Sequence, residues 1–158
     1  MSKTQITGKS MNQPVRDFTD ILLRRGLISM DQLAEAAQLS KDSNTNLADA
    51  LIKTGYADPN DVYQALAEFH KLDFVDLSVV KIPEEVIQLV PESVARENSV
   101  IPYKEEDDVI HVLLSDPFDL ETNEKLRFIL NRRIETALAP RDSIHEAINR
   151  YYGQVEGE

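Results

Sequence analysis

The side chains that could do chemistry in this chain of 158 residues are few and scattered. The three histidines, His70, His111 and His145, fall in different predicted elements and lack the spacing of a metal site. The acidic run at residues 105–108 lacks the spacing and the glycine of a calcium loop, so we interpret it as a solvated hairpin tip. The two aspartates in residues 116–119 are interpreted as a strand stop and a helix cap rather than a catalytic pair.

Sequence motifs for nucleophilic or phosphoryl chemistry are also missing. No serine lies in a Gly-x-Ser-x-Gly elbow, and the absence of cysteine excludes disulfides and a thiolate zinc site. No Walker A pattern occurs, because the glycines are too dispersed to cradle a phosphate. They are Gly8, Gly26, Gly55, Gly153 and Gly157. We therefore predict that the chain is not an enzyme, with no catalytic residue and no metal ion.

The charge balance narrows the class of partner. With 28 acidic and 17 basic residues the net charge is −11, which disfavours binding to nucleic acid. The basic clusters are only the pairs Arg24-Arg25 and Arg132-Arg133, which we interpret as solvated helix ends or turns. No apolar run approaches the ~20 residues of a membrane span, and the N-terminus lacks the apolar core of a signal peptide. We expect a soluble, cytoplasmic protein, and the lack of cysteine suits that compartment.

An internal repeat defines the elements of the first half of the chain. Residues 18–37 align without a gap with residues 47–66, and each copy reads as a helix, a glycine turn and a second helix. The identical pairs are Asp20 with Asp49, Leu22 with Leu51, Gly26 with Gly55 and Ala36 with Ala65. The repeat predicts a subdomain of four short helices.

Helix boundaries in the repeats are marked by capping residues. Ser29 is a suitable N-cap for the second helix, and Asn46 or Thr45 for the third. Asp58 before Pro59 marks the start of the fourth helix. The predicted buried stripe of the second helix consists of Met30, Leu33, Ala36 and Ala37.

The second half changes to a mixture of short strands and helices. Two apolar runs around the acidic residues 105–108 predict a hairpin whose second strand is central, and a strand–helix–strand unit follows. Leu126, Ile129 and Leu130 are expected to face inward, and Gly153 to end the last helix. Residues 73–77 are expected to form a short extended segment, and the expected strands are 100–103, 109–114 and 134–138. The expected helices are 83–89, 91–97, a helix from Asp119 or Thr122 to about Leu130, and 143–152.

These elements predict an α+β fold. A four-helix subdomain made of two helix–Gly–helix repeats is followed by a small α/β subdomain with a three-stranded sheet and flanking helices. The predicted boundaries are a flexible tail at 1–14, the repeats at 15–72, the α/β subdomain at 73–153, and an acidic tail or linker at 154–158.

The ordered set of motifs resembles the N-terminal domain of type II secretion and type IV pilus assembly ATPases, called MshEN or the GspE N-terminal domain. The resemblance rests on the duplicated glycine-turn unit and, in the second half, on residues 100–102, 112–119, 126–128 and 147–153. It implies a domain that precedes a hexameric ATPase and docks on a platform component of the inner membrane.

In one branch of that family each repeat begins with Arg-Leu-Gly, ends near a glutamine, and the pair wraps cyclic di-GMP. Arginine offers a planar fork for phosphate or guanine. The matching positions here are Arg16, one place early, with Phe18, Leu22, Gly26, Leu47, Leu51 and Gly55. The triplets themselves have become Asp17-Phe18-Thr19 and Asn46-Leu47-Ala48, and Ser40 and Phe69 replace the glutamines. An acidic residue at the phosphate position disfavours the nucleotide.

The leading hypothesis is a non-catalytic interaction or regulatory domain, in a stand-alone protein or at the front of a longer one. Its partner would be the cytoplasmic domain of a platform protein, or an ATPase domain in the same or another chain, with recruitment to the inner-membrane face. The expected docking face is Phe18, Ile21, Arg24 and Arg25 on the first helix. The alternatives are a cyclic di-GMP sensor with altered contacts, and an adaptor in surface motility or signalling.

Overall fold

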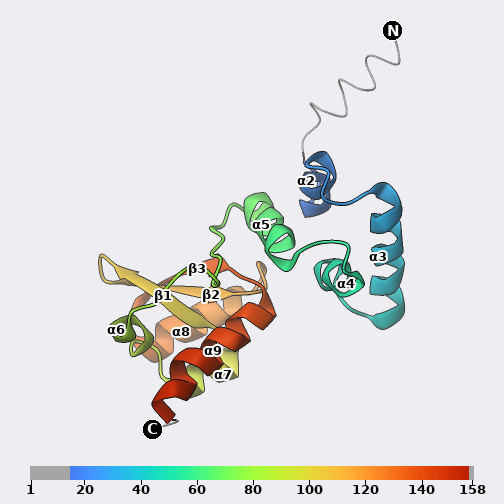
Figure 1. The fold of residues 1–158 in the computed structure, drawn as a ribbon. Coiled ribbons are helices and arrows are strands. Elements are labelled where there is room, and N and C mark those ends of the chain that lie inside the picture. Colours follow the sequence, from blue (N-terminus) through green and yellow to red (C-terminus); the bar gives the residue numbers. More distant parts are fainter. Residues whose placement is uncertain (1–14, 157–158) are drawn as a thin grey trace. The chain divides into compact units, whose positions relative to one another are not determined.

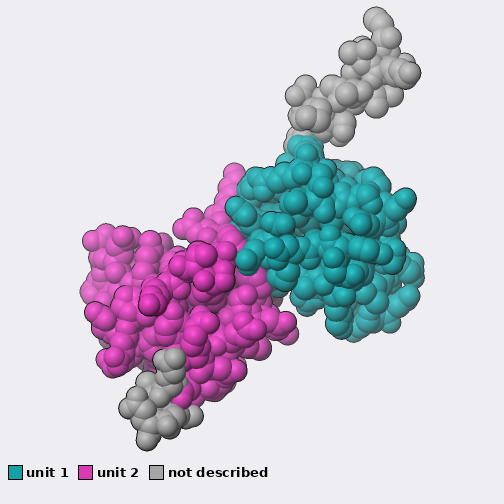
Figure 2. All heavy atoms as spheres, viewed as in Figure 1, with its two compact units in different colours: residues 1–69 teal, residues 70–158 magenta. Residues whose placement is uncertain are grey.

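The computed structural model describes residues 15–156 and divides the chain into two compact units, residues 1–69 and 70–158 (Figure 2). Within the described residues there are eight α-helices and one three-stranded sheet. The first unit holds helices only and the second holds the sheet, so the predicted α+β class is confirmed. The predicted tail at residues 1–14 lies outside the described part of the chain.

The first unit contains the two helix–glycine–helix repeats (Figure 1). Their helices are α2 (Phe18–Arg24), α3 (Met30–Ser43), α4 (Leu47–Thr54) and α5 (Pro59–His70). Gly26 and Gly55 have φ of +71° and +80°, the left-handed conformation in which glycine ends a helix without strain. Ser29 caps α3 through a reciprocal pair with Gln32, in which each backbone N–H donates to the other's side-chain oxygen.

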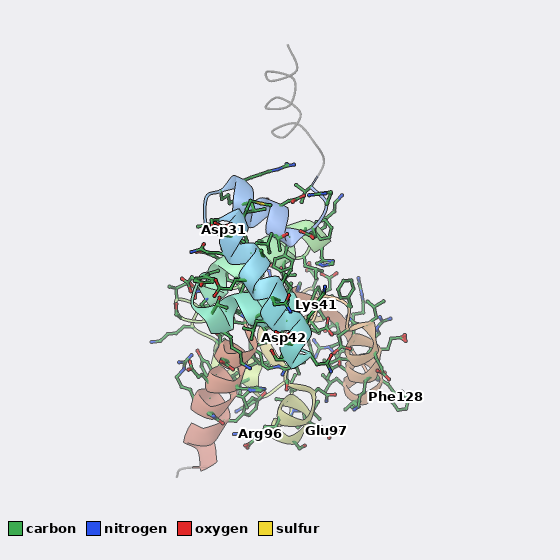
Figure 3. All side chains as sticks on the ribbon, turned by 90° about the vertical axis from the view of Figure 1, so that its right-hand side faces the viewer. Asp31, Lys41, Asp42, Arg96, Glu97 and Phe128 are labelled. Atoms are coloured by element: carbon green, nitrogen blue, oxygen red, sulfur yellow. The ribbon has the colours of Figure 1, made fainter. Side chains whose placement is uncertain are left out.

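The core of the first unit is built from small and branched side chains of all four helices. Leu22, Leu51 and Val62 are fully buried, together with Ala36 of α3. The predicted stripe of α3 is wrong at Met30, which is 68% exposed. Met30 lies about a third of a turn around the helix from Ala36, so it faces solvent. The exposed side of α3 also carries Asp31, Lys41 and Asp42 (Figure 3).

The sheet of the second unit has the strand order β1-β2-β3. β1 (Ile101–Glu106) pairs antiparallel with β2 (Val109–Leu114), and β2 pairs parallel with β3 (Arg133–Leu138) through the intervening α8 (Leu120–Leu130). Five of the six residues of β2 are buried, so side chains on both of its faces are covered, as predicted for a central strand. The hairpin and the strand–helix–strand unit are confirmed.

Strand pairing is irregular at both edges of the sheet. Edge strand β1 carries Pro102, which has no N–H, and its register shifts between Pro102 and Lys104. Beside β3, Phe74 forms a single parallel bridge with Leu138, supported by hydrogen bonds from Leu138 N to Asp73 O at 2.8 Å and from Val75 N to Leu138 O at 3.1 Å. The extended segment expected at residues 73–77 therefore contacts the sheet through one isolated bridge and adds no further named strand.

Four helices complete the second unit: α6 (Glu84–Ile87), α7 (Glu92–Asn98), α8 and α9 (Arg141–Glu156). α9 contacts β1 and β2, and α8 contacts β3 (Figure 1). The buried hydroxyl of Tyr152 donates to the carbonyls of Ile87 and Val90, at 3.2 and 2.8 Å, which ties α9 to the segment between α6 and α7.

Two expectations for these helices are wrong. Gly153 does not end α9, which continues to Glu156, because the glycine holds helical geometry with open space around it. Residues 154–156 are therefore helical, and 157–158 lie outside the described range. Ile129 is 46% exposed, since the buried side of α8 consists of Thr122 and Leu126 only.

Gly55 after α4 and Gly153 within α9 give a matched test of this backbone description. Gly55→Ala should lower the free energy of unfolding by about 1–2 kcal/mol, because alanine is strained at positive φ. Gly153→Ala should raise it by about 0.5–1 kcal/mol, because the site is helical and has room for a methyl group. Urea denaturation followed by circular dichroism measures both. Equal effects of the two substitutions would contradict the assigned conformations.

Candidate functional site

The start of the first repeat is closed by its own side chains. Asp17, at the position of the family arginine, is the N-cap of α2 and accepts from the backbone N–H of Thr19 at 2.9 Å and of Asp20 at 3.3 Å. The same carboxylate oxygen accepts from the hydroxyl of Thr19, which is buried. Asp17 therefore neutralises the positive end of its own helix, where a ligand phosphate would otherwise be attracted.

The second repeat begins in the same way. Asn46 caps α4, and its side-chain oxygen accepts from the backbone N–H of Asp49 at 2.7 Å. Ala48 is buried, so its methyl group belongs to the packing of the unit. At the start of each repeat, the polar side chain of Asp17 or Asn46 therefore acts as a helix cap.

The residues that replace the family glutamines have local roles as well. Ser40 donates its hydroxyl to the carbonyl of Thr45, and Thr45 N donates to Ser40 O at 3.1 Å, which fixes the turn between α3 and α4. Phe69 lies near the end of α5 and is half-buried.

Arg16, the candidate substitute for the family arginine, is engaged with the helix that follows it. Its backbone N–H donates to Asp20 Oδ2 at 2.8 Å, and its Nε lies 3.4 Å from the same oxygen. The backbone hydrogen bond, with the nearby guanidinium, holds the pKa of Asp20 below its usual value. The side chain of Arg16 is otherwise exposed, and Asp20 neutralises part of its charge.

The remaining predicted site residues either support the packing of the helices or lie at the surface. Leu22 and Leu51 are fully buried, Gly26 and Gly55 form the left-handed turns, and Phe18 and Leu47 are half-buried. Of the expected docking face, Ile21 is only 6% exposed, so it belongs to the core because it follows the same helical stripe as Leu22. Arg24 and Arg25 are exposed, and Arg25 forms an ion pair with Glu68 at 2.6 Å.

The histidines lie on different elements: His70 is the last residue of α5, where the second unit begins, and His111 and His145 lie on β2 and α9. The rings of His70 and Phe118 make an edge contact at 4.8 Å, His111 lies 4.0 Å from Glu135, and His145 hydrogen-bonds Ser99 at 3.1 Å. Among the described residues no group of three or more His, Cys, Asp or Glu side chains is arranged to hold a metal ion.

Tyr103 is the half-buried ionisable side chain of the sheet. Burial, with the carboxylates of Asp73, Glu135 and Glu106 nearby, raises its pKa to about 12. Its phenol is therefore neutral at physiological pH.

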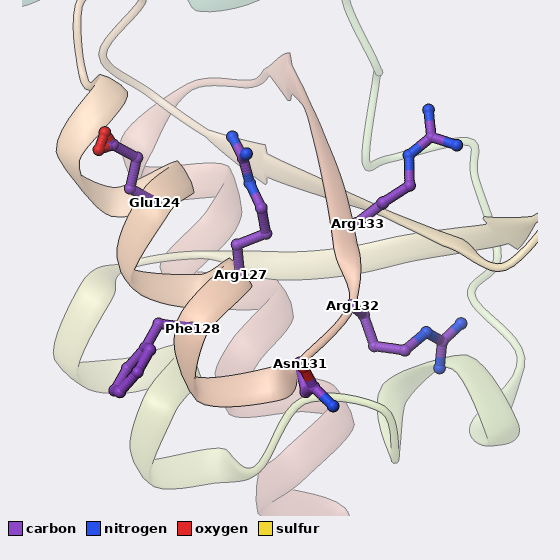
Figure 4. A pocket seen from close by; sticks show the side chains of 6 residues that line it. All are labelled: Glu124, Arg127, Phe128, Asn131, Arg132 and Arg133. Carbon is purple, nitrogen blue, oxygen red and sulfur yellow. The ribbon is translucent and has the colours of Figure 1, made fainter.

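One surface was missed by sequence reasoning. The end of α8 and the start of β3 border an open pocket of about 680 Å³, lined by Glu124, Arg127, Phe128, Asn131, Arg132 and Arg133 (Figure 4). The signal in the sequence is the pair Arg132-Arg133, for which the sequence predicts a solvated helix end or turn. Arg132 does fit that interpretation in part, because it forms ion pairs with Glu105 and Asp108 of the hairpin tip.

No helix in the described part of the chain is both long and apolar enough to cross a membrane.

Comparison with known proteins gives a consistent result. The model of the MshEN domain family matches residues 70–158, the second unit. The type IV pilus assembly ATPase PilB of Myxococcus xanthus strain DK1622 is 30% identical over 135 residues, which are 85% of this chain and 24% of that protein. The chain thus spans about a quarter of the length of this relative.

Two solved structures share the fold. The structure of MshE with cdg, cyclic di-GMP, has a TM-score of 0.69 and 28% identity, and the match covers 87% of this chain and all of that one. The N-terminal domain of XpsE has a TM-score of 0.64 and 22% identity, covering 89% of this chain and all of that one. Both matches extend well beyond the second unit, so the repeats are part of the shared fold.

The capping role of the two repeat starts can be measured directly. Asp17→Ala and Asn46→Ala should each lower the free energy of unfolding by about 1 kcal/mol, because a backbone N–H loses its acceptor. Asp17→Ser and Asn46→Ser should leave the free energy of unfolding close to that of the parent chain, because serine also caps helices. Lys41→Ala on the exposed side of α3 serves as the control. Equal stability of the alanine and serine variants in urea would contradict the capping role.

Proposed function

The chain belongs to the MshEN domain family, and from that premise we propose that it is a non-catalytic domain that docks on a protein partner. The partner would be the cytoplasmic domain of an inner-membrane platform protein of a secretion or pilus machine. The working site would be cytoplasmic, at the inner face of that membrane. The likeness to PilB and to the N-terminal domain of XpsE supports this context.

One observation carries the choice of protein docking over nucleotide binding. Asp17 and Asn46 stand at the starts of the two repeats and use their side-chain oxygens to cap α2 and α4. The phosphates of a cyclic dinucleotide need cations or free N–H groups. At these two helix starts, N–H groups already donate to the side-chain oxygens of Asp17 and Asn46. What remains of the repeats is a packed framework that can present a surface.

The proposed docking face lies on the first helix and the turn after it. Ile21 is removed from this face by its burial, which leaves Phe18, Arg24 and Arg25 of the original set. Leu27, in the following turn, is 37% exposed and adds an apolar side chain beside the arginines. Arginine next to apolar surface is a common composition at protein interfaces.

Binding of the platform component's cytoplasmic domain tests this proposal. Biolayer interferometry with the full chain should show saturable binding, and Arg24→Glu with Leu27→Ala should weaken it about tenfold or more, as for interface hot spots. Arg141→Glu, an exposed arginine at the start of α9, makes the same charge change in the second unit and should leave binding unchanged. Absence of binding by the parent chain would refute platform docking.

The second candidate function is a cyclic di-GMP-binding regulatory domain. It is favoured by the likeness to MshE, whose solved structure includes this nucleotide. For it to hold, Arg16 would have to leave Asp20 and reach a phosphate, and the two N-caps would have to be displaced.

Isothermal titration with cyclic di-GMP separates the two candidates. The parent chain should release no heat of binding, because Asp17 repels the phosphate and fills the helix N-terminus. The combined variant Asp17→Arg, Phe18→Leu, Thr19→Gly, Asn46→Arg and Ala48→Gly restores both family triplets and should bind if the framework alone is sufficient. Micromolar binding by the parent chain would instead establish the nucleotide function.

A further inference from the structure

The outer surface of α8 carries more exposed apolar area than the fold requires. Four of the eight large hydrophobic side chains exposed among the described residues lie between residues 118 and 129. Phe128 is 88% exposed and Leu120 is 75% exposed. Single exposed apolar residues are ordinary, but a cluster on one helix marks a place where another molecule binds.

These side chains form a line along the helix. Leu120, Glu124 and Phe128 are spaced by four residues, so they lie on one face of α8, opposite the buried Thr122 and Leu126. Phe128 lies on the outer side of its helix (Figure 3). The contact area available to a partner is therefore an elongated ridge about two helical turns long.

Two arginines without an ion-pair partner among the described residues lie at the Phe128 end of the ridge, whereas the exposed Glu121 lies on the ridge itself, two turns before Phe128. Arg127 and Arg133 border the same pocket as Phe128, and neither has a carboxylate partner among the described residues. The guanidinium of Arg127 is held in place by the side-chain oxygen of Asn123, at 2.9 Å, which is neutral. In Figure 4 both side chains extend toward the same side, Arg127 from α8 and Arg133 from the start of β3.

This local charge is opposite to that of the whole chain. The net charge is −11, and the neighbouring Arg132 is already bound to Glu105 and Asp108. Glu124 is the single carboxylate that lines the pocket among the described residues. A partner that places acidic groups at this surface gains attraction there, whereas a long polyanion such as nucleic acid meets repulsion from the rest of the molecule.

We infer that the α8 surface, defined by Leu120, Glu124, Arg127, Phe128 and Arg133, binds an acidic amphipathic helix of a partner protein. The apolar side of that helix would pack on Leu120 and Phe128, and its carboxylates would pair with Arg127 and Arg133. The pocket is open rather than enclosed, which suits a helix laid along the α8 ridge better than a small ligand. This surface is in the second unit, so it is independent of the docking face proposed on α2.

Fluorescence anisotropy with synthetic peptides and the full chain tests the inference. The probe is a labelled peptide of about 15 residues with leucines at helical spacing and flanking glutamates, and its control replaces each glutamate by lysine. The acidic peptide should bind, and its affinity should fall as salt is raised because exposed charges are screened. Equal binding of the lysine peptide, or no binding of the acidic one, would overturn the inference.

Variants of the surface supply the matched comparison. Arg127→Glu with Arg133→Glu, and separately Phe128→Ala, should each weaken the acidic peptide about tenfold or more. Arg141→Glu makes a like charge change elsewhere on the unit, and Val79→Ala removes a different exposed apolar side chain, so both should bind as the parent does. Circular dichroism checks that each variant is folded, and a folded pair of surface variants with unchanged affinity would refute the site.

Two other occupants of the surface are distinguishable outcomes. Sedimentation that shows a dimer of the parent chain, lost in Phe128→Ala, would overturn the inference in favour of a second copy. Sedimentation with vesicles of equimolar phosphatidylglycerol and phosphatidylcholine that depends on Arg127 and Arg133 would overturn it in favour of a lipid surface. The inference is supported if the parent chain is monomeric, does not sediment with the vesicles and binds the acidic peptide.

Discussion

The first unit depends on one constraint, the need of every helix N-terminus for hydrogen-bond acceptors. The first N–H groups of a helix have no partner within it. Short helices have few other internal bonds, so these acceptors decide where each one begins. Asp17, Ser29 and Asn46 supply a side-chain oxygen at the starts of α2, α3 and α4. In the second unit Asp119 does the same for α8, accepting from Thr122 N at 3.0 Å.

Under the proposed function, the same hydrogen bonds would distinguish this chain from MshE, whose solved structure includes cyclic di-GMP. Leu22, Leu51 and the turns at Gly26 and Gly55 are what two helix–turn–helix units need in order to pack. None of these residues identifies a ligand. The positions that the family resemblance predicts to face a nucleotide are the first residues of each repeat, and here Asp17 and Asn46 cap helices. A shared fold therefore says less about this site than the two capping side chains do.

Features set by local geometry could be predicted from the sequence. The two turns follow from the backbone preference of glycine, and the caps follow from the side-chain preference of Ser29 and Asn46. The central strand follows from a run of apolar residues. Features set by tertiary packing could not. Whether Ile129 is buried depends on what lies across from α8, and helical spacing does not supply that. The α8 surface was missed for a related reason, since its arginines come from two elements that only the folded sheet brings together.

The edges of the sheet have a consequence for how the second unit behaves when many copies are crowded together. Pro102 removes a donor from the edge strand, the register shift bends it, and the charged residues 104–106 follow. On the opposite edge the Phe74 bridge covers the end of β3, and Asn123 donates to the carbonyl of Ile134 at 3.3 Å. Both edges are therefore partly blocked as templates for another strand. The sheet is therefore guarded against runaway aggregation, and partners must recognise its helices and side chains instead of extending its backbone.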